Sequence, residues 1–264
     1  FSPESDLEGV IGYVPQDDLL VEDLTVFENL YYSAALCSGD KTKEELTEMV
    51  NQTLQSLGLY KKRNAKVGSL LNKTISGGQR KRLNIALELI REPSVLFLDE
   101  PTSGLSSRDS ENIMELMHDL ARKGKLIITV VHQPSSEIFK GFDKVIIIDQ
   151  EGELVYSGNP VEAVIYFKTL AAQINSDVGE CPTCGNVNPE IIFDILESRV
   201  IDEFGKYTER RKVLPSEWAE AFKKRYSFAV PAEEKTPPYS TLKRPGWIKQ
   251  TAIYLGRDIK SKLA

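Results

Sequence analysis

The chain has 264 residues, of which 41% are hydrophobic and 27% charged, a composition that supports a buried core and excludes an intrinsically disordered protein. Its 33 Lys and Arg residues against 39 Asp and Glu residues give a net charge of −6, so no nucleic-acid partner is expected. The charge is uneven, because residues 240–264 carry a net +5 and the rest of the chain −11. A basic end on an acidic body indicates contact with an anionic surface.

The first predicted elements are a strand and a helix. Gly9–Val14 is a short apolar run that ends at Pro15-Gln16, which predicts a strand. Thr42-Lys-Glu-Glu45 has the form of a capping box. Behind it one helix face is predicted from residues at helical spacing, with Gly58 as its C-terminal cap: Leu46, Met49, Val50, Thr53, Leu54 and Leu57.

Three further apolar runs predict strands. They are Val95–Leu98, Leu126–Val131 and Val145–Ile148, and continuous Val, Ile and Leu runs are typical of parallel strands buried on both faces. All fall far short of the ~20 residues that a membrane-spanning helix needs. A helix predicted around Ile113–Leu120 makes the first two runs a strand–helix–strand crossover. Ligands of such sheets bind beyond the carboxyl ends of the strands, where the sequence places Gln16, Asp99, Glu100 and His132.

The C-terminal part is predicted to be mostly helical from residue 161 to residue 228. Ala229–Pro238 has the composition of a linker. Apolar residues from Trp247 to Leu263 then recur at helical spacing with lysines and arginines between them, which predicts a basic amphipathic helix. We expect residues 245–264 to contact a membrane surface, and the alternative is that Trp247 and Ile248 pack against the body of the protein.

Two segments have residue types suited to nucleotide chemistry. Val95–Glu100 is an apolar strand that ends in two adjacent carboxylates, the Walker B arrangement of nucleotide hydrolases. Asp99 would hold Mg²⁺ and Glu100 would polarise the attacking water, whereas the alternative is an ordinary strand end with a helix-capping acid. Ser76-Gly-Gly-Gln79 opens a helix and could offer its N–H groups to an anion, or could be a glycine turn that only starts the helix.

The segments together resemble the nucleotide-binding domain of ATP-binding-cassette transporters. In chain order they correspond to the Q-loop (Tyr13–Gln16), the signature (Ile75–Gln79), Walker B (Leu96–Pro101), the D-loop (Thr102–Leu105) and the H-loop (Val131–Ser136). The sequences Gly12–Leu19, Gln79–Arg82 and His132–Ile138 are similar to the G subfamily of half-transporters, and the basic helix resembles the connecting helix that precedes its first membrane span.

This resemblance implies an α/β fold with ATP and Mg²⁺ as ligands. Gln16 would contact Mg²⁺ or the water, and His132 would contact the γ-phosphate. In a head-to-tail dimer with a second nucleotide-binding domain, Ser76, Gly78 and Gln79 would contact the γ-phosphate bound on the opposite subunit. Gly77, Ser103 and Gly104 are the other residues expected to bind nucleotide. One departure is Ser106, which stands where the D-loop usually carries Asp, and the nearest acid is Asp109.

The family's phosphate loop, Gly-x-x-x-x-Gly-Lys-[Ser/Thr], is absent from these 264 residues. The fold expected is therefore an incomplete P-loop NTPase (RecA-like) parallel sheet with helices, an inserted helical signature subdomain and a mostly helical C-terminal extension. The expected boundaries are 1–27 and 94–160 for the nucleotide-binding core, 28–93 for the helical subdomain, 161–228 for the extension, and 229–264 for the linker and connecting helix. We expect a fragment of a longer protein that is inactive alone.

The function expected for the intact parent is an ATPase that drives transport, with export as the direction and the cytoplasmic face of the membrane as the location. Its transmembrane domain would belong to the same polypeptide. The alternatives are a soluble cassette ATPase and an interaction fragment that no longer handles nucleotide. Separately, Cys181 and Cys184 have the spacing of one zinc knuckle, for which the alternative is a turn with two reduced thiols.

Overall fold

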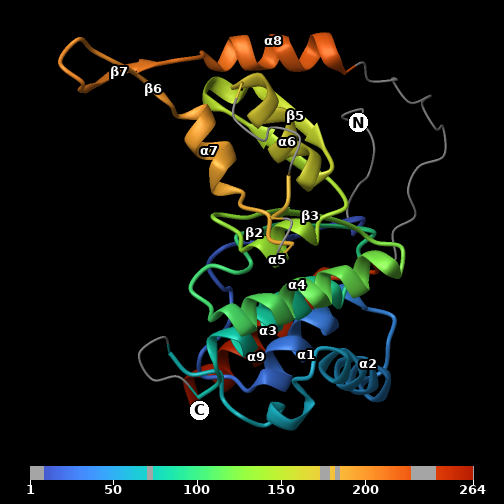
Figure 1. The fold of residues 1–264 in the computed structure, drawn as a ribbon. Helices are drawn as coiled ribbons and strands as arrows, with labels where there is room; N and C mark the ends of the chain where they lie inside the picture. The colour runs from blue at the N-terminus through green and yellow to red at the C-terminus, as the bar shows by residue number, and fades with distance from the viewer. Residues whose placement is uncertain (1–8, 70–73, 173–178, 182–184, 227–241, 264) are drawn as a thin grey trace, which may run out of the picture. The chain divides into compact units, whose positions relative to one another are not determined.

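The computed structural model describes residues 9–69, 74–172, 179–181, 185–226 and 242–263, so the predicted linker lies outside the described residues. The chain divides into two compact units, one formed by Phe1–His132 with Glu234–Ala264 and the other by Gln133–Glu233. Each unit has its own hydrophobic core, and Figure 1 labels most of the helices and strands of both.

The first unit contains a parallel sheet. Strands β1 (Ile11–Val14), β2 (Val95–Asp99) and β3 (Leu126–Val130) pair in that order. Helix α4 (Ser107–Arg122) connects β2 to β3, which confirms the predicted strand–helix–strand unit. Because all three strands run in the same direction, their carboxyl ends lie at one edge of the sheet.

The sheet is covered on one face in the part of the chain that the structure describes. Val14, Leu96 and Leu98 are at most 1% exposed and pack with residues of α3 (Gly77–Leu89) and α4. Strand side chains alternate between the two faces. On the opposite face four apolar side chains are 36% to 59% exposed, which contradicts the expectation of burial on both faces: Phe97, Leu126, Ile128 and Val130.

Helices α1 (Val26–Cys37), α2 (Lys43–Ser56) and α3 surround a second core of this unit, together with the 3-10 helix η1 (Tyr60–Lys62). The predicted capping box is confirmed at α2, where Thr42 and Glu45 bond to each other's backbone N–H groups. Gly58 follows the helix with a φ of +66°, a conformation that glycine adopts without strain. Helices α1 and α3 begin with capping boxes of the same kind.

Helix α9 (Trp247–Leu263) is the predicted basic amphipathic helix, and it packs against α1. Ile253 contacts the helical core, and the Lys260 ammonium forms an ion pair with Glu28 in the first turn of α1. The alternative prediction for Trp247 and Ile248 is wrong, because they are 76% and 68% exposed. Among the described residues no helix is both long enough and apolar enough to cross a membrane.

The second unit begins with α5 (Ser136–Lys140) and an antiparallel pair of strands, β4 (Val145–Ile148) and β5 (Leu154–Gly158). The sequence pattern of β4 was expected for a parallel strand, and this expectation is wrong. The connection is a single 3-10 turn, η2 (Gln150–Gly152), with positive φ angles at Glu151 and Gly152. Such a short connection joins antiparallel strands only, because a parallel crossover needs a dozen or more residues.

The rest of the second unit is mostly helical and has an aromatic core. It contains α6 (Pro160–Leu170), α7 (Glu190–Leu196), the hairpin β6 (Arg199–Ile201) and β7 (Tyr207–Arg211), and α8 (Pro215–Arg225). The buried rings of this core come from α5, β5, α6 and α8: Phe139, Tyr156, Tyr166, Phe167, Trp218 and Phe222. Burial raises the pKa of Tyr166 to about 12.

We predict that Leu54→Ala lowers the free energy of unfolding of the first unit by about 2–5 kcal/mol, because the Leu54 side chain is fully buried between α1, α2 and α3. Gln55→Ala on the exposed side of the same helix is the matched control and should change stability by less than about 0.5 kcal/mol. Urea unfolding of both variants measures the difference, and equal midpoints would contradict the assignment of this core.

Candidate functional site

The carboxyl edge of the parallel sheet brings the Q-loop and Walker B residues together. Gln16 follows β1 and Glu100 follows β2, and the Gln16 amide Nε2 donates a hydrogen bond of 3.1 Å to Glu100 Oε2. The two residues are 84 positions apart in the chain, so the parallel pairing of β1 with β2 creates this contact. The bond holds the Glu100 carboxylate in a defined orientation at the edge.

The neighbouring residues complete the edge. The Tyr13 hydroxyl donates to Asp99 Oδ2 at 3.3 Å, and desolvation together with the Asp99 charge raises the pKa of Tyr13. Glu100 has a φ of +41°, a conformation that costs of order 1–3 kcal/mol for a residue with a side chain. Its N–H donates to the Val130 carbonyl at 3.1 Å, which fixes this turn on β3.

His132 is placed two residues after the end of β3, the strand that neighbours β2. Its side chain is exposed, and within the described residues it forms no hydrogen bond with Gln16 or Glu100. The structure therefore places His132 at the same edge without joining it to the other two side chains.

The signature residues cap helix α3. Ser76 Oγ accepts a hydrogen bond of 3.2 Å from the Gln79 N–H, and Gln79 Oε1 accepts one of 3.0 Å from the Ser76 N–H. The N–H groups of Gly77 and Gly78 have no hydrogen-bond partner among the described residues. Free N–H groups in the first turn of a helix are suited to an anionic ligand, because the helix dipole adds a partial positive charge there.

Close packing against α4 explains one of the two glycines of the signature, Gly78. A Cβ atom at Gly78 would lie 2.6 Å from Asp109 Oδ1, and one at Gly77 would lie 3.4 Å from Leu105 Cδ2. Ser106, the departure from the usual D-loop, caps α4 by accepting from the Asp109 N–H at 3.2 Å. Ser103 and Gly104 form an exposed turn between these contacts, with a φ of +70° at Gly104.

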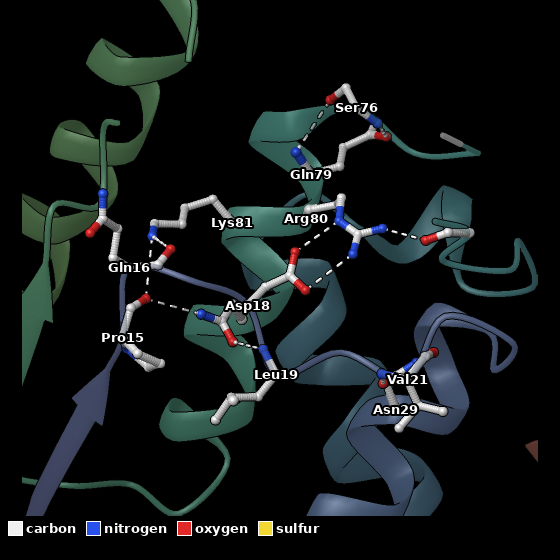
Figure 2. Close-up of polar contacts among 12 residues, drawn as sticks. Pro15, Gln16, Asp18, Leu19, Val21, Asn29, Ser76, Gln79, Arg80 and Lys81 are labelled. Carbon is white, nitrogen blue, oxygen red and sulfur yellow. Dashed lines mark hydrogen bonds and ion pairs between the residues drawn. The ribbon is translucent and has the colours of Figure 1, made fainter. Parts of the chain in front are cut away.

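Helix α3 also contacts the Q-loop through residues that the sequence did not single out. The Arg80 guanidinium forms two bonds with the Asp18 carboxylate, of 2.8 and 3.1 Å, and the Asn84 amide accepts from the Leu19 N–H (Figure 2). Lys81 is the third of these buried polar residues. In the sequence these cations stand in the run Gln79-Arg-Lys-Arg82, which by itself indicates the subfamily but not the contact with the Q-loop.

The acidic edge fits a magnesium ion better than it fits zinc. Mg²⁺ takes one or two protein oxygens and completes its shell with phosphate and water. The Asp99 carboxylate could supply one such oxygen, and Gln16 keeps its side-chain oxygen available because its nitrogen bonds to Glu100. The described residues contain no group of three or more His, Cys, Asp or Glu side chains that could hold a metal. Zinc has no support, and Cys184 lies outside the described residues.

Comparison with known proteins agrees with the motifs and the fold. Residues 2–103 match the family model described as ABC transporter, and residues 132–238 match the one described as ABC-2 type transporter. ABC transporter G family member 22 of Arabidopsis thaliana is 35% identical over 97% of this chain and 37% of its own length.

Animal and fungal relatives are similar over shorter stretches. A broad substrate specificity ATP-binding cassette transporter of Sus scrofa is 44% identical over 60% of this chain and 24% of its own length. An ABC-type transporter of Penicillium crustosum is 41% identical over 81% of this chain and 28% of its own length. The chain thus spans well under half the length of these relatives.

The parallel sheet, the inserted helices and the ordered motifs define an ATP-binding-cassette nucleotide-binding domain with a P-loop NTPase fold. Within this class the chain belongs to the ABC transporter G family.

We predict that Gly78→Ala lowers the free energy of unfolding by about 1–3 kcal/mol, because the new methyl group overlaps the Asp109 carboxylate. Gly77→Ala is the matched control, since its methyl group meets Leu105 at an ordinary distance and alanine favours the helix by about 1 kcal/mol. Denaturant unfolding measures both, and adding Asp109→Ala should recover most of the Gly78→Ala loss. Equal effects of the two glycine variants would contradict this packing.

Proposed function

We propose that the full-length gene product couples ATP hydrolysis to transport across a membrane, in the direction of export. The observation that carries the proposal is the hydrogen bond between Gln16 and Glu100, because it joins the Q-loop to the acid that follows Walker B. The relatives, which are named as ABC transporters, support the same activity.

The proposed chemistry assigns one role to each residue of the edge. Glu100 accepts a hydrogen bond from the attacking water and polarises it, and the Gln16 amide holds the Glu100 carboxylate in place. Asp99 and Gln16 are the proposed ligands of Mg²⁺, which neutralises charge on the phosphates when it is bound. His132 is proposed to contact the γ-phosphate, and its exposure at the end of β3 supports access to a ligand.

The second half of the proposed site is formed across a dimer. The signature residues of one chain would contact the nucleotide bound by a second nucleotide-binding domain arranged head to tail. Among the residues that the structure describes, the N–H groups of Gly77 and Gly78 at the start of α3 have no hydrogen-bond partner, which supports this role. The D-loop turn, with Ser103 and Gly104, is proposed to contact the same nucleotide, and its exposure supports that proposal.

The proposed organisation places the chain at the cytoplasmic face of a membrane, with a transmembrane domain in the same polypeptide. The match of residues 132–238 to a model of ABC-2 type transporters supports this fusion. Contact of residues 245–264 with the membrane surface is proposed because α9 combines exposed apolar side chains with basic residues. The expected boundaries at residues 27, 93, 160 and 228 remain part of the proposal.

We predict that Glu100→Gln in the full-length gene product lowers kcat for ATP hydrolysis by about 100-fold or more and leaves binding of Mg-ATP intact. The substitution keeps the size of the side chain and removes the carboxylate that polarises water. Release of phosphate and binding of a fluorescent ATP analogue measure the two quantities.

Glu111→Gln on the exposed side of α4 is the matched control, since it removes the same charge away from the sheet edge. It should leave kcat within about twofold of wild type. Hydrolysis by the Glu100→Gln variant at a rate near that of wild type would overturn the proposed role.

We also predict that the 264-residue chain alone binds Mg-ATP no tighter than about 1 mM and does not hydrolyse it. The reason is that its sequence has no phosphate loop, whose N–H groups and Lys hold the β- and γ-phosphates in P-loop enzymes. Titration calorimetry measures the affinity, with the full-length gene product as the positive control. A dissociation constant in the micromolar range for the short chain would refute this prediction.

A further inference from the structure

Three polar side chains on helix α3 are buried, and the proposed chemistry does not use them. Arg80 is 4% exposed, Lys81 is 8% exposed and Asn84 is 2% exposed. Burial of a cation costs free energy unless the charge is paired and hydrogen-bonded. Two adjacent buried cations on the helix that begins with the signature therefore need a specific set of partners.

Most of those partners lie in the Q-loop and the three residues that follow it (Figure 2). Lys81 Nζ donates to the Gln16 carbonyl at 2.9 Å and to the Pro15 carbonyl at 3.4 Å. The Arg80 guanidinium pairs with the Asp18 carboxylate and also donates to the Gly68 carbonyl. Asn84 accepts from the Leu19 N–H at 3.3 Å and donates to the Pro15 carbonyl at 3.5 Å. We call these three residues of α3, together with residues 15–19, the Q-loop clamp.

Negative charges near Lys81 offset part of the cost of burying its ammonium group. Burial lowers the pKa of Lys81, and the carboxylates of Asp18, Asp99, Asp17 and Glu100 act in the opposite direction. The Lys81 ammonium thus lies in the field of the Walker B acids as well as of the Q-loop. An apolar residue at this position would leave the two carbonyls of the Q-loop without this donor.

Gln16 connects the clamp to the reacting end of the sheet. Lys81 bonds to the main-chain carbonyl of Gln16, and the side chain of Gln16 bonds to Glu100. The position of α3 therefore determines where the Gln16 amide lies, and the amide determines how the Glu100 carboxylate is held.

We infer that Lys81 and Arg80 are positioning residues, which fix the Q-loop on the signature helix so that the signature and the Gln16 amide move as one body. Lys81 acts through Gln16, and Arg80 supports the same loop through Asp18. This role rests on the proposed function, because it matters for activity only if Gln16 and Glu100 take part in ATP hydrolysis.

The test is a double-mutant cycle between Lys81→Met and Gln16→Ala in the full-length gene product. Lys81→Met should lower kcat for ATP hydrolysis by about tenfold and leave KM for ATP within about twofold, because it misplaces an amide without removing a nucleotide contact. In the Gln16→Ala background the same substitution should change kcat by less than about twofold, since the group through which Lys81 acts is gone. Losses that multiply in the double variant would overturn the inference.

Asn29→Ala is the matched control for a purely structural effect. Asn29 is 7% exposed and its side chain bonds to both the N–H and the carbonyl of Val21, whereas within the described residues it forms no hydrogen bond with residues 15–19. Its effect on kcat should be the same with and without Gln16→Ala. If Lys81→Met does not fold, Asp18→Asn tests the same clamp and should show the same dependence on Gln16 with a smaller loss of about threefold.

The Glu100→Gln variant, measured in the same preparations, distinguishes a failure of the proposed function from a failure of the positioning role. Full activity of Glu100→Gln would remove the proposed function, and the positioning role with it. Loss of activity in Glu100→Gln together with multiplying losses for Lys81 and Gln16 would remove the positioning role alone.

Discussion

Burial of helix α3 is the constraint on which the first unit depends, because this helix supplies side chains to two cores at once. Leu83 and Ala86 of the helix, together with Ile90 just after it, pack among α1 and α2, whereas Ile85 packs against the parallel sheet. The same helix carries the signature at its N-terminus and the buried cations that bond to the Q-loop. Core residues and candidate functional residues thus lie on the same helix. A shift of α3 would therefore change both the packing of the two cores and the position of the functional residues.

The candidate site is an acidic sheet edge that faces cations from α3. Asp99 and Glu100 lie at the end of β2, and their charges act on the buried ammonium of Lys81, which donates to the carbonyls of Pro15 and Gln16. Burial lowers the pKa of Lys81, and the negative charges of Asp99 and Glu100 offset part of this effect. The D-loop closes against the signature glycines from the other side, and Gly78 leaves no room for a side chain beside Asp109.

Helix α9 carries most of the basic residues that make the C-terminal end of the chain positive. One side of it packs on the first unit, where Lys260 pairs with Glu28, and the main chain of Lys243, just before the helix, bonds to Cys37 and Gly39. The ion pair lowers the pKa of Glu28 despite the partial burial of that carboxyl. The other side keeps Trp247 and Ile248 exposed beside basic residues. A helix with both properties is suited to connect the first unit to a surface outside it.

The sequence by itself determined the elements whose signals are local. Capping boxes, apolar periodicity and the order of the motifs predicted α2, α3, the three strands of the sheet and the residues at its carboxyl edge, because each signal lies within a few neighbouring residues. Only the tertiary structure decided that β4 pairs with β5, that one face of the sheet is exposed, and that Lys81 bonds to Gln16. These outcomes depend on partners far along the chain or on which helix covers which face. A run of Ile and Val is the same in a parallel and an antiparallel strand, and a lysine in a helix is the same in sequence whether it faces water or a carbonyl 65 residues away.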